Sequence, residues 1–210
     1  MMKLTKYGHA CFTLEKDGKV LVVDPGGISP DFIVPEHVVA IVVTHEHADH
    51  FDPDVLAAIY DLNPTSILIS TSEVITHMPD HEGHIAEPNE SFTVGPFELQ
   101  FTGGTHAVIY PTIPLINNFG VMINHRLYYP GDSFAPAPET VDVLALPVSA
   151  PWLKFSEAID FMIATKPRLV FPTHDAIYSS AGNGIVDRLV PLLASPYAIT
   201  YQRLDGSIEI

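Results

Sequence analysis

Residues 41–53 read Ile41-Val42-Val43-Thr44-His45-Glu46-His47-Ala48-Asp49-His50-Phe51-Asp52-Pro53, an apolar run followed at once by a cluster of polar side chains. The β-branched residues that open this stretch predict a short strand buried on both faces. Because side chains alternate along extended backbone, His45 and His47 are expected to point to the same side. Asp52 has the character of a helix N-cap and Pro53 that of a first helical residue, so the polar turn lies between a strand and a helix.

The polar turn places histidines at positions 45, 47 and 50 and an aspartate at position 49. Imidazole nitrogens and carboxylates are ligands that zinc, iron and manganese take from proteins. A solvated, histidine-rich turn is the alternative interpretation, and it would be favoured for a single histidine after a strand. For four donors at this spacing we predict a metal site.

Composition sets the broad class of the protein. The 210 residues are 47% hydrophobic and contain no linker-like segment or run of like charges, so we expect one domain over residues 1–210. Residues 1–7 lack the apolar segment of a secretory signal, and no stretch approaches the roughly twenty apolar residues of a membrane span. These features predict a cytoplasmic protein that does not bind a membrane.

Charge and cysteine content narrow the class further. The sequence has 10 lysines and arginines against 25 aspartates and glutamates, a formal charge of -15, which disfavours binding to a nucleic acid. A small-molecule substrate is expected instead, and a homo-oligomer stays open. The single cysteine, Cys11, lies in an apolar strand and is expected to be a buried, inert thiol.

The rest of the chain alternates predicted strands and helices in two similar halves. Strands are predicted at 4–7, 10–14, 20–23, 66–69, 143–146 and 169–171, and helices at 53–62, 72–78, 156–164 and 185–193. A meander of antiparallel strands is predicted at 91–94, 97–101, 119–124 and 127–129. Residues 198–201 and 207–210 are expected to form a closing hairpin through Asp205-Gly206.

The run His45-x-His47-x-Asp49-His50 resembles the signature of the metallo-β-lactamase fold superfamily. Four further stretches are similar to the other motifs of that family and follow in its order, namely Val22-Val23-Asp24-Pro25-Gly26, Gly103-Gly104-Thr105-His106, Tyr129-Pro130-Gly131-Asp132-Ser133 and Phe171-Pro172-Thr173-His174. The resemblance runs from about Leu4 to His174. The opening Gly8-His9-Ala10-Cys11-Phe12 and the short length are most similar to the branch of ascorbate-phosphate-lactonase-like and other small metal-dependent hydrolases.

The resemblance implies both a fold and a cofactor. The implied fold is mixed α/β (α+β), a four-layer αββα sandwich in which two sheets face each other with helices outside, and the strand and helix order above is compatible with it. The implied cofactor is a pair of divalent transition metals, zinc first and manganese or iron as alternatives. One ion would be held by His45, His47 and His106, the other by Asp49, His50 and His174, with Asp132 as the bridge. Asp24 would support the ligands by hydrogen bonds, although a strand-end aspartate that caps a turn is the simpler interpretation.

The implied activity is hydrolysis of a small molecule. A hydroxide shared by the two ions would attack an ester, lactone or phosphoester, with Asp49 and Asp132 as the catalytic carboxylates of the cage. The family's true β-lactamases carry cysteine in place of Asp132 and its flavodiiron proteins carry glutamate in place of His47, so neither of those activities is expected. The alternatives are a mononuclear iron dioxygenase of the same fold and a non-catalytic metal-binding ligand sensor.

Four further residues are candidates for contact with the substrate. Lys154 is one of few cations and follows a strand that should end near the site, where it would bind a substrate carboxylate or phosphate, unless it is plain surface charge. Tyr110, in an apolar loop rich in proline, and Tyr178 could each offer a hydroxyl to a tetrahedral intermediate. His9 follows the first strand and either lies near the metals or has a structural role.

Overall fold

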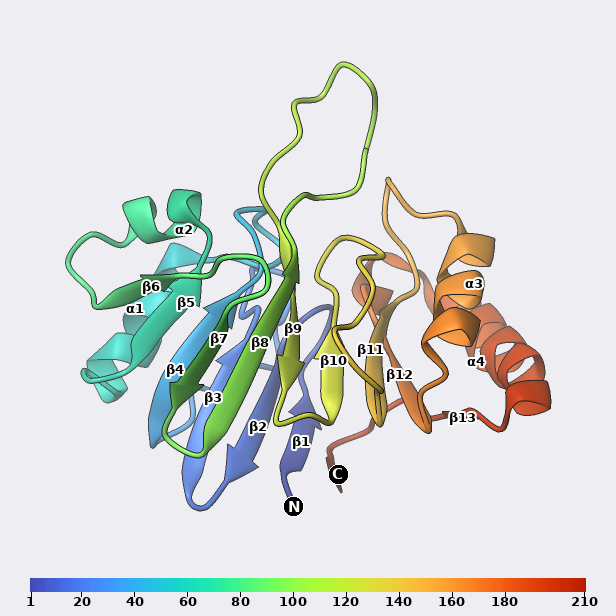
Figure 1. The fold of residues 1–210 in the computed structure, drawn as a ribbon, viewed down its shortest axis with the longest axis horizontal. Coiled ribbons are helices and arrows are strands. Elements are labelled where there is room, and N and C mark those ends of the chain that lie inside the picture. The colour runs from blue at the N-terminus through green and yellow to red at the C-terminus, as the bar shows by residue number, and fades with distance from the viewer.

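Two seven-stranded sheets face each other in the computed structural model, which describes residues 1–210 (Figure 1). The first sheet has the order β14-β1-β2-β3-β4-β5-β6 and is built from Ser207–Glu209, Lys3–Lys6, Phe12–Lys16, Lys19–Val23, Val38–Val43, Ile67–Ser70 and Gly83–Ile85 in that order. The second has the order β13-β12-β11-β10-β9-β8-β7 and is built from Thr200–Tyr201, Leu169–Thr173, Val143–Pro147, Leu127–Tyr129, Phe119–Ile123, Phe97–Gly103 and Ser91–Val94.

Helices cover the outer faces of both sheets (Figure 1). Helices α1 (Pro53–Leu62) and α2 (Ser72–His77) lie on the first sheet, and α3 (Phe155–Thr165) and α4 (Ser180–Ala194) lie on the second. Two 3₁₀ turns, η1 (Asp175–Ile177) and η2 (Ser195–Tyr197), precede and follow α4. None of these helices combines the length and the apolar character that crossing a membrane requires.

Three apolar clusters correspond to the three interfaces of this arrangement. The largest contains 25 buried residues and lies between the sheets, where the inward faces of β2, β3, β8 and β9 meet. A cluster of 15 packs the second sheet against α3 and α4, and one of 12 packs the first sheet against α1. An apolar layer on each side of both sheets is what a four-layer αββα sandwich requires, so the predicted fold class is confirmed.

Strand direction explains why the polar motifs meet. Strands β3 to β6 are parallel to one another, and so are β10 to β13, while β8 runs parallel to β10 because both are antiparallel to β9. The motifs predicted to carry ligands follow the carboxyl ends of β3, β4, β8, β10 and β12. Carboxyl ends of parallel strands share one edge of a sheet, so all five motifs lie at the same end of the sandwich.

Two of the expected elements differ in the structure. The closing hairpin is wrong, since β13 pairs with β12 in the second sheet whereas β14 pairs with β1 in the first. The turn at Asp205-Gly206 therefore crosses from one sheet to the other. Residues 83–85, where no strand was predicted, form the edge strand β6 beside β5. The predicted meander is confirmed as the antiparallel run from β7 to β10.

Candidate metal centre

The turn after β4 holds its histidines by backbone hydrogen bonds. The strand ends at Val43, and the amides of His50 and Phe51 both donate to the carbonyl of His47 at 2.9 Å, which closes a tight turn. His45 and His47 therefore lie outside the extended strand, yet the Nε2 atom of His45 and the Nδ1 atom of His47 are 3.1 Å apart. The side chains of His45 and His47 lie close together, as expected, but the turn brings them together and not the alternation of side chains along a strand.

Left-handed backbone aims the ligands that the second sheet contributes. His106 follows Gly103 and Gly104, whose φ angles are 81° and 136°. Asp132 follows Gly131 with φ 61°, and its amide donates to the Oδ1 atom of Asn118 at 2.9 Å. His174 itself adopts φ 61° directly after β12. Backbone with positive φ is uncommon outside glycine and bends the chain sharply. Here such a bend at each strand end turns the ligand side chain inward.

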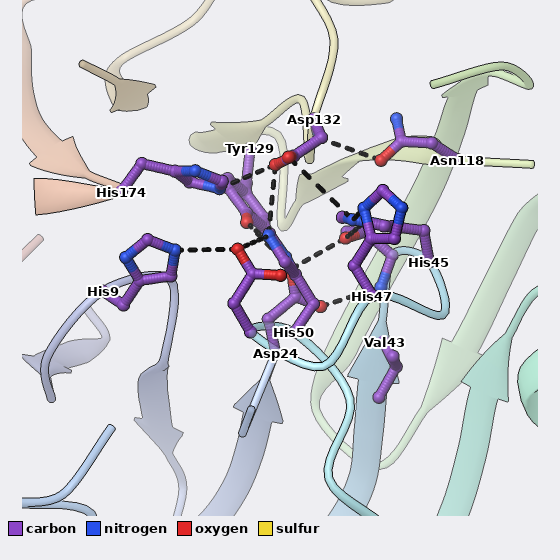
Figure 2. A network of polar contacts seen from close by, with 12 residues as sticks. His9, Asp24, Val43, His45, His47, His50, Asn118, Tyr129, Asp132 and His174 are labelled. Atoms are coloured by element: carbon purple, nitrogen blue, oxygen red, sulfur yellow. Dashed lines mark hydrogen bonds and ion pairs between the residues drawn. The ribbon is translucent and has the colours of Figure 1, made fainter. Parts of the chain in front are cut away.

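The predicted ligands form two groups of close donor atoms (Figure 2). Within each group the ligand atoms lie within 4.8 Å of one another; one group is His45, His47, His106 and Asp132, and the other is His9, Asp49, His50 and His174. The structure thus brings together all seven residues that the resemblance implied as ligands. It adds His9 to the second group, and Glu46 belongs to neither group.

Asp132 lies between the two groups. Its Oδ1 atom is 2.6 Å from the Nε2 atom of His174 and 3.2 Å from that of His50, and its Oδ2 atom is 3.3 Å from the Nε2 atom of His106. The side chain is 5% exposed. One carboxylate that faces both groups is the arrangement expected of a bridging ligand.

Asp24 is fully buried and accepts hydrogen bonds from three neighbours. The Thr44 amide and hydroxyl donate to it at 2.8 and 2.7 Å, the Tyr129 hydroxyl donates at 2.8 Å, and the Nδ1 atom of His50 lies at 2.6 Å. A proton held on Nδ1 of His50 leaves the lone pair of Nε2 directed into the site. Asp24 can therefore orient the ligand His50 by a hydrogen bond as well as cap the turn.

His9 approaches the second group from the turn after β1. Its Nε2 atom is 3.0 Å from the Oδ2 atom of Asp49, its ring lies 4.4 Å from the ring of His174, and its Nδ1 atom is buried without a hydrogen-bond partner. Burial lowers the pKa of His9, and the hydrogen bond to Asp49 offsets only part of that effect. The sequence left a position near the metals and a structural role equally open for His9, and the geometry places it beside the cluster.

Electrostatics make the cluster a site for positive charge. Burial alone would raise the pKa of Asp132, but the imidazoles of His174 and His50 outweigh it and hold the pKa well below its usual range. Burial opposes protonation of His50, yet the carboxylates of Asp132 and Asp24 raise its pKa well above the ordinary value. Metal ions compete with protons for such donors, so binding weakens as pH falls.

The donor atoms fit a metal. Four ligand atoms are buried and lie near one another, but their orientations do not allow hydrogen bonds. They are the Nε2 atoms of His50, His106 and His174 and the Oδ1 atom of Asp132. Buried polar atoms without partners are rare because each costs free energy. The Nδ1 atom of His106 lies 2.6 Å from the Ala107 carbonyl, which fixes the proton there and frees Nε2.

Comparison with known proteins agrees with the fold. Residues 3–174 match the family described as "Beta-lactamase superfamily domain". The chain belongs to this family. The resemblance found in the sequence is confirmed, and the chain is similar over most of its length to Protein Rv0786c of Mycobacterium tuberculosis, with 35% identity over 88% of this chain and 89% of that protein.

Two further proteins are similar to this member of the beta-lactamase superfamily. A protein of Salinibacter ruber that is named a metal-dependent hydrolase is 27% identical over 82% of this chain and 84% of its own length. The solved structure of Igni18, described as a novel metallo hydrolase from Ignicoccus hospitalis, has a TM-score of 0.74 at 19% identity and covers 100% of this chain and 99% of that one. The second similarity shows the shared fold.

A cavity of about 410 Å³ opens beside the donor cluster of this superfamily member. It is lined by donors of both groups and by a wall without charge, formed by Ala48, Ile109, Ala150, Pro151, Trp152 and Ile177. Of the residues proposed to contact substrate, Tyr110 is 62% exposed on the loop beyond Ile109, and Tyr178 follows Ile177. Lys154 lies exposed at the N-cap of α3, and none of these three lines the cavity.

Trp152 is a residue of the site that sequence reasoning missed. Its Nε1 atom donates a hydrogen bond of 2.8 Å to the Oδ2 atom of Asp132, and its ring packs against Phe134 at 5.2 Å between centroids. A signal was available, since Trp152 is the single tryptophan of the chain and follows the end of the strand β11.

We expect Trp152→Phe to lower metal affinity about tenfold, because a hydrogen bond that orients a ligand is lost while the aromatic packing stays. Competition with a chromogenic chelator measures the affinity. Phe134→Leu is the matched control, since it changes the packing against Trp152 without removing the hydrogen bond, and it should leave the affinity within a few-fold. Equal effects of both substitutions would contradict an orienting role.

Gly26 lets two motifs approach each other closely. A Cβ atom there would overlap the backbone of Asp49 and His50, whereas one at Gly27 would lie 3.3 Å from the Ala48 carbonyl oxygen. The amide of Gly27 donates to that same carbonyl at 2.8 Å. In the sequence, the motif around Asp24 was interpreted only as a strand end with a carboxylate. The structure shows that Gly26 of this motif is also needed, because the turn that carries Asp49 and His50 packs directly on it.

Gly26→Ala is therefore expected to lower the free energy of unfolding by about 1–3 kcal/mol, as overpacking of a filled site does, and to displace the turn that carries Asp49 and His50. Chemical denaturation and metal content measure the two effects. Gly27→Ala, one residue along, would place its methyl group 3.3 Å from the Ala48 carbonyl oxygen, a contact that a small shift relieves, and should cost clearly less. Similar losses in both variants would show that general backbone flexibility, and not this contact, matters.

Proposed function

We propose that this chain is a metal-dependent hydrolase that holds two divalent transition metals in its histidine and aspartate cluster and cleaves an ester, lactone or phosphoester bond of a small molecule. The observation that carries the proposal is the convergence of two groups of four donors from both sheets on one buried centre beside a cavity. The family membership and the hydrolase name of the Salinibacter ruber relative support the same class of activity.

The donor set suits zinc, with manganese or iron as alternatives, because imidazoles and carboxylates are ligands that these ions share. His45, His47 and His106 would hold one ion, Asp49, His50 and His174 the other, and Asp132 both. When bound, such a pair supplies an acidified water as nucleophile and a positive charge for the substrate oxygen.

The chain's own residues prepare the site for this chemistry. Asp132 is a carboxylate at neutral pH, since its pKa is held low by His174 and His50 in spite of its burial. Asp24 and the Ala107 carbonyl fix the protons of two imidazoles away from the centre. The apolar wall of the cavity keeps bulk water from the side on which a substrate would lie.

Protein purified without chelator is expected to contain about two transition metal ions per chain and to lose hydrolysis of a panel of esters, lactones and phosphodiesters when they are removed. Elemental analysis gives the stoichiometry. His174→Ala should reduce it to about one, because it removes a donor of a single group, and His125→Ala is a matched control because that histidine is half exposed between Glu98 and Glu139.

Other results of the metal analysis and the activity panel would favour the two alternative functions. A single iron with oxygen consumption would favour the mononuclear dioxygenase and overturn the hydrolase. Two ions without turnover of any member of the panel would favour a ligand sensor.

A further inference from the structure

The cavity beside the metal centre has two chemically different sides. One side carries the donors His47, Asp49, His106, Asp132 and His174. The opposite wall is formed by the aliphatic and aromatic side chains of Ile109, Ala150, Pro151, Trp152 and Ile177. A bound substrate therefore presents its reacting bond to the donors and the rest of its surface to apolar side chains.

Positive side chains lie elsewhere in the molecule. None of the ten lysines and arginines lines the cavity. Lys6 and Arg203 are both paired with Asp175, the residue after His174, and the side chain of Lys6 is 7% exposed. Arg126 and Arg168 are paired with Asp142 on a different surface. A carboxylate or phosphate on the non-reacting part of a substrate would have no cationic partner here, and its desolvation would go uncompensated.

A second observation concerns the loop between β8 and β9. This loop projects from the sandwich at the end where the ligand motifs lie (Figure 1). Its residue Ile109 lines the cavity, and Val108, Tyr110, Ile113 and Leu115 around it are exposed. Ile177 on the other side of the cavity is also exposed. The loop that contributes Ile109 to the wall therefore carries further exposed apolar side chains.

We propose that the substrate is an uncharged ester or lactone whose apolar chain or ring lies against Ile109, Trp152 and Ile177. This rests on the proposed hydrolase function and specifies its substrate class. In the reaction, water adds its oxygen to the acyl carbon, the bond from that carbon to the ester oxygen breaks, and the leaving oxygen takes a proton, so that an acid and an alcohol are formed. Substrates with anionic tails are disfavoured by the same wall.

Fluorescence of Trp152 tests binding without any need for turnover. It is the single tryptophan of the chain and a wall residue of the cavity, so its emission reports occupancy directly. Metal-loaded protein is titrated with neutral methyl ketones from 2-butanone to 2-nonanone and with keto acids of equal length. We expect the dissociation constant to fall about threefold for each added methylene, from the transfer of a CH₂ group out of water, and the keto acids to bind at least tenfold more weakly. Equal or tighter binding of the keto acids would overturn the proposal.

Kinetics with matched esters test the same point in the reaction. Hexanoate esters should exceed acetates of the same alcohol at least tenfold in kcat/KM, and succinate half-esters should fall below both. Ile177→Lys should reverse the order of hexanoate and succinate by placing a cation at the wall. Leu192→Lys is the matched control, because Leu192 on α4 is 64% exposed, against 51% for Ile177, and lies outside the cavity.

The two proposals fail in distinguishable ways. If no ester is hydrolysed but the ketones bind more tightly with length, the hydrolase function falls while the apolar substrate surface stands. If acetates are hydrolysed but chain length has no effect, or succinate half-esters are preferred, the substrate class falls while the hydrolase function stands. A reversal by Leu192→Lys as large as that by Ile177→Lys would also overturn the proposal, since it would show a general effect of surface charge.

Discussion

Asp132→Ala is expected to abolish hydrolysis, with a fall in kcat/KM of at least about a thousandfold, the upper end of what loss of one preorganised electrostatic group costs. Asp132 faces His174 and His50 of one donor group and His106 of the other, so its removal weakens both ion sites together. The protein should still fold, because the side chain lies at a strand end and not within the apolar core. Metal content measured by elemental analysis should fall with activity.

The control for Asp132→Ala is Cys11→Ala. Cys11 is buried, and burial raises the pKa of its thiol, followed by the nearby charge of Asp24. The inert thiol expected from the sequence agrees with this environment, and its removal should leave the rate within a few-fold. Near wild-type activity of Asp132→Ala would contradict the bridging role, and loss of activity in folded Cys11→Ala would indicate thiol chemistry instead.

Asp24→Ala is expected to lower the free energy of unfolding by about 3–5 kcal/mol, the cost of removing one partner from a buried charged network. The carboxylate accepts hydrogen bonds from Thr44 and Tyr129 and lies 2.6 Å from the Nδ1 atom of His50, and each of these groups would lose its contact with the carboxylate. Metal affinity should fall about 10- to 100-fold as well, because the His50 proton is no longer held on Nδ1. Denaturant unfolding and chelator competition measure the two effects.

Two further variants serve as comparisons for Asp24→Ala. Tyr129→Phe removes one donor but leaves the carboxylate with its other partners, so its cost should be about 1 kcal/mol. Asp31→Ala replaces an exposed aspartate of the same segment and should stay within about 0.5 kcal/mol of the parent. If Asp24→Ala behaved like Asp31→Ala, the carboxylate would be only a strand-end cap.

The histidine and aspartate motif could be predicted because its information is local. His45, His47, Asp49 and His50 lie within one turn, and Asp52 and Pro53 start α1 as the sequence indicated, with the Asp52 carboxylate accepting from the amides of Asp54 and Val55. The distant ligands followed from the order of the motifs. Their common position has a simple physical basis, since each follows the carboxyl end of a strand and those ends share one edge.

Contacts between distant segments could not be predicted in the same way. Residues 198–210 have the turn and the alternation of apolar residues that are typical of a hairpin. In the fold, however, β13 pairs with the edge of one sheet and β14 with the edge of the other, so the two strands do not pair with each other. Trp152 looks like a packing residue until Asp132 is placed opposite its indole nitrogen. The side chains of His77, His81 and His84 form no common donor group. His81 stacks on Tyr60 and His84 pairs with Glu90, and the spacing of these histidines does not indicate either contact.

The pairing of β14 with β1 has a consequence for the order of folding. The amide of Met2 donates to the carbonyl of Ile210, and the amide of Ile210 donates back to the carbonyl of Met2, so this contact spans nearly the whole sequence. Strand β1 therefore keeps one unpaired edge until β14 has been synthesised, and contacts so distant in sequence close slowly. During synthesis that edge is open to pairing with other nascent chains, which makes binding by a chaperone most useful at β1.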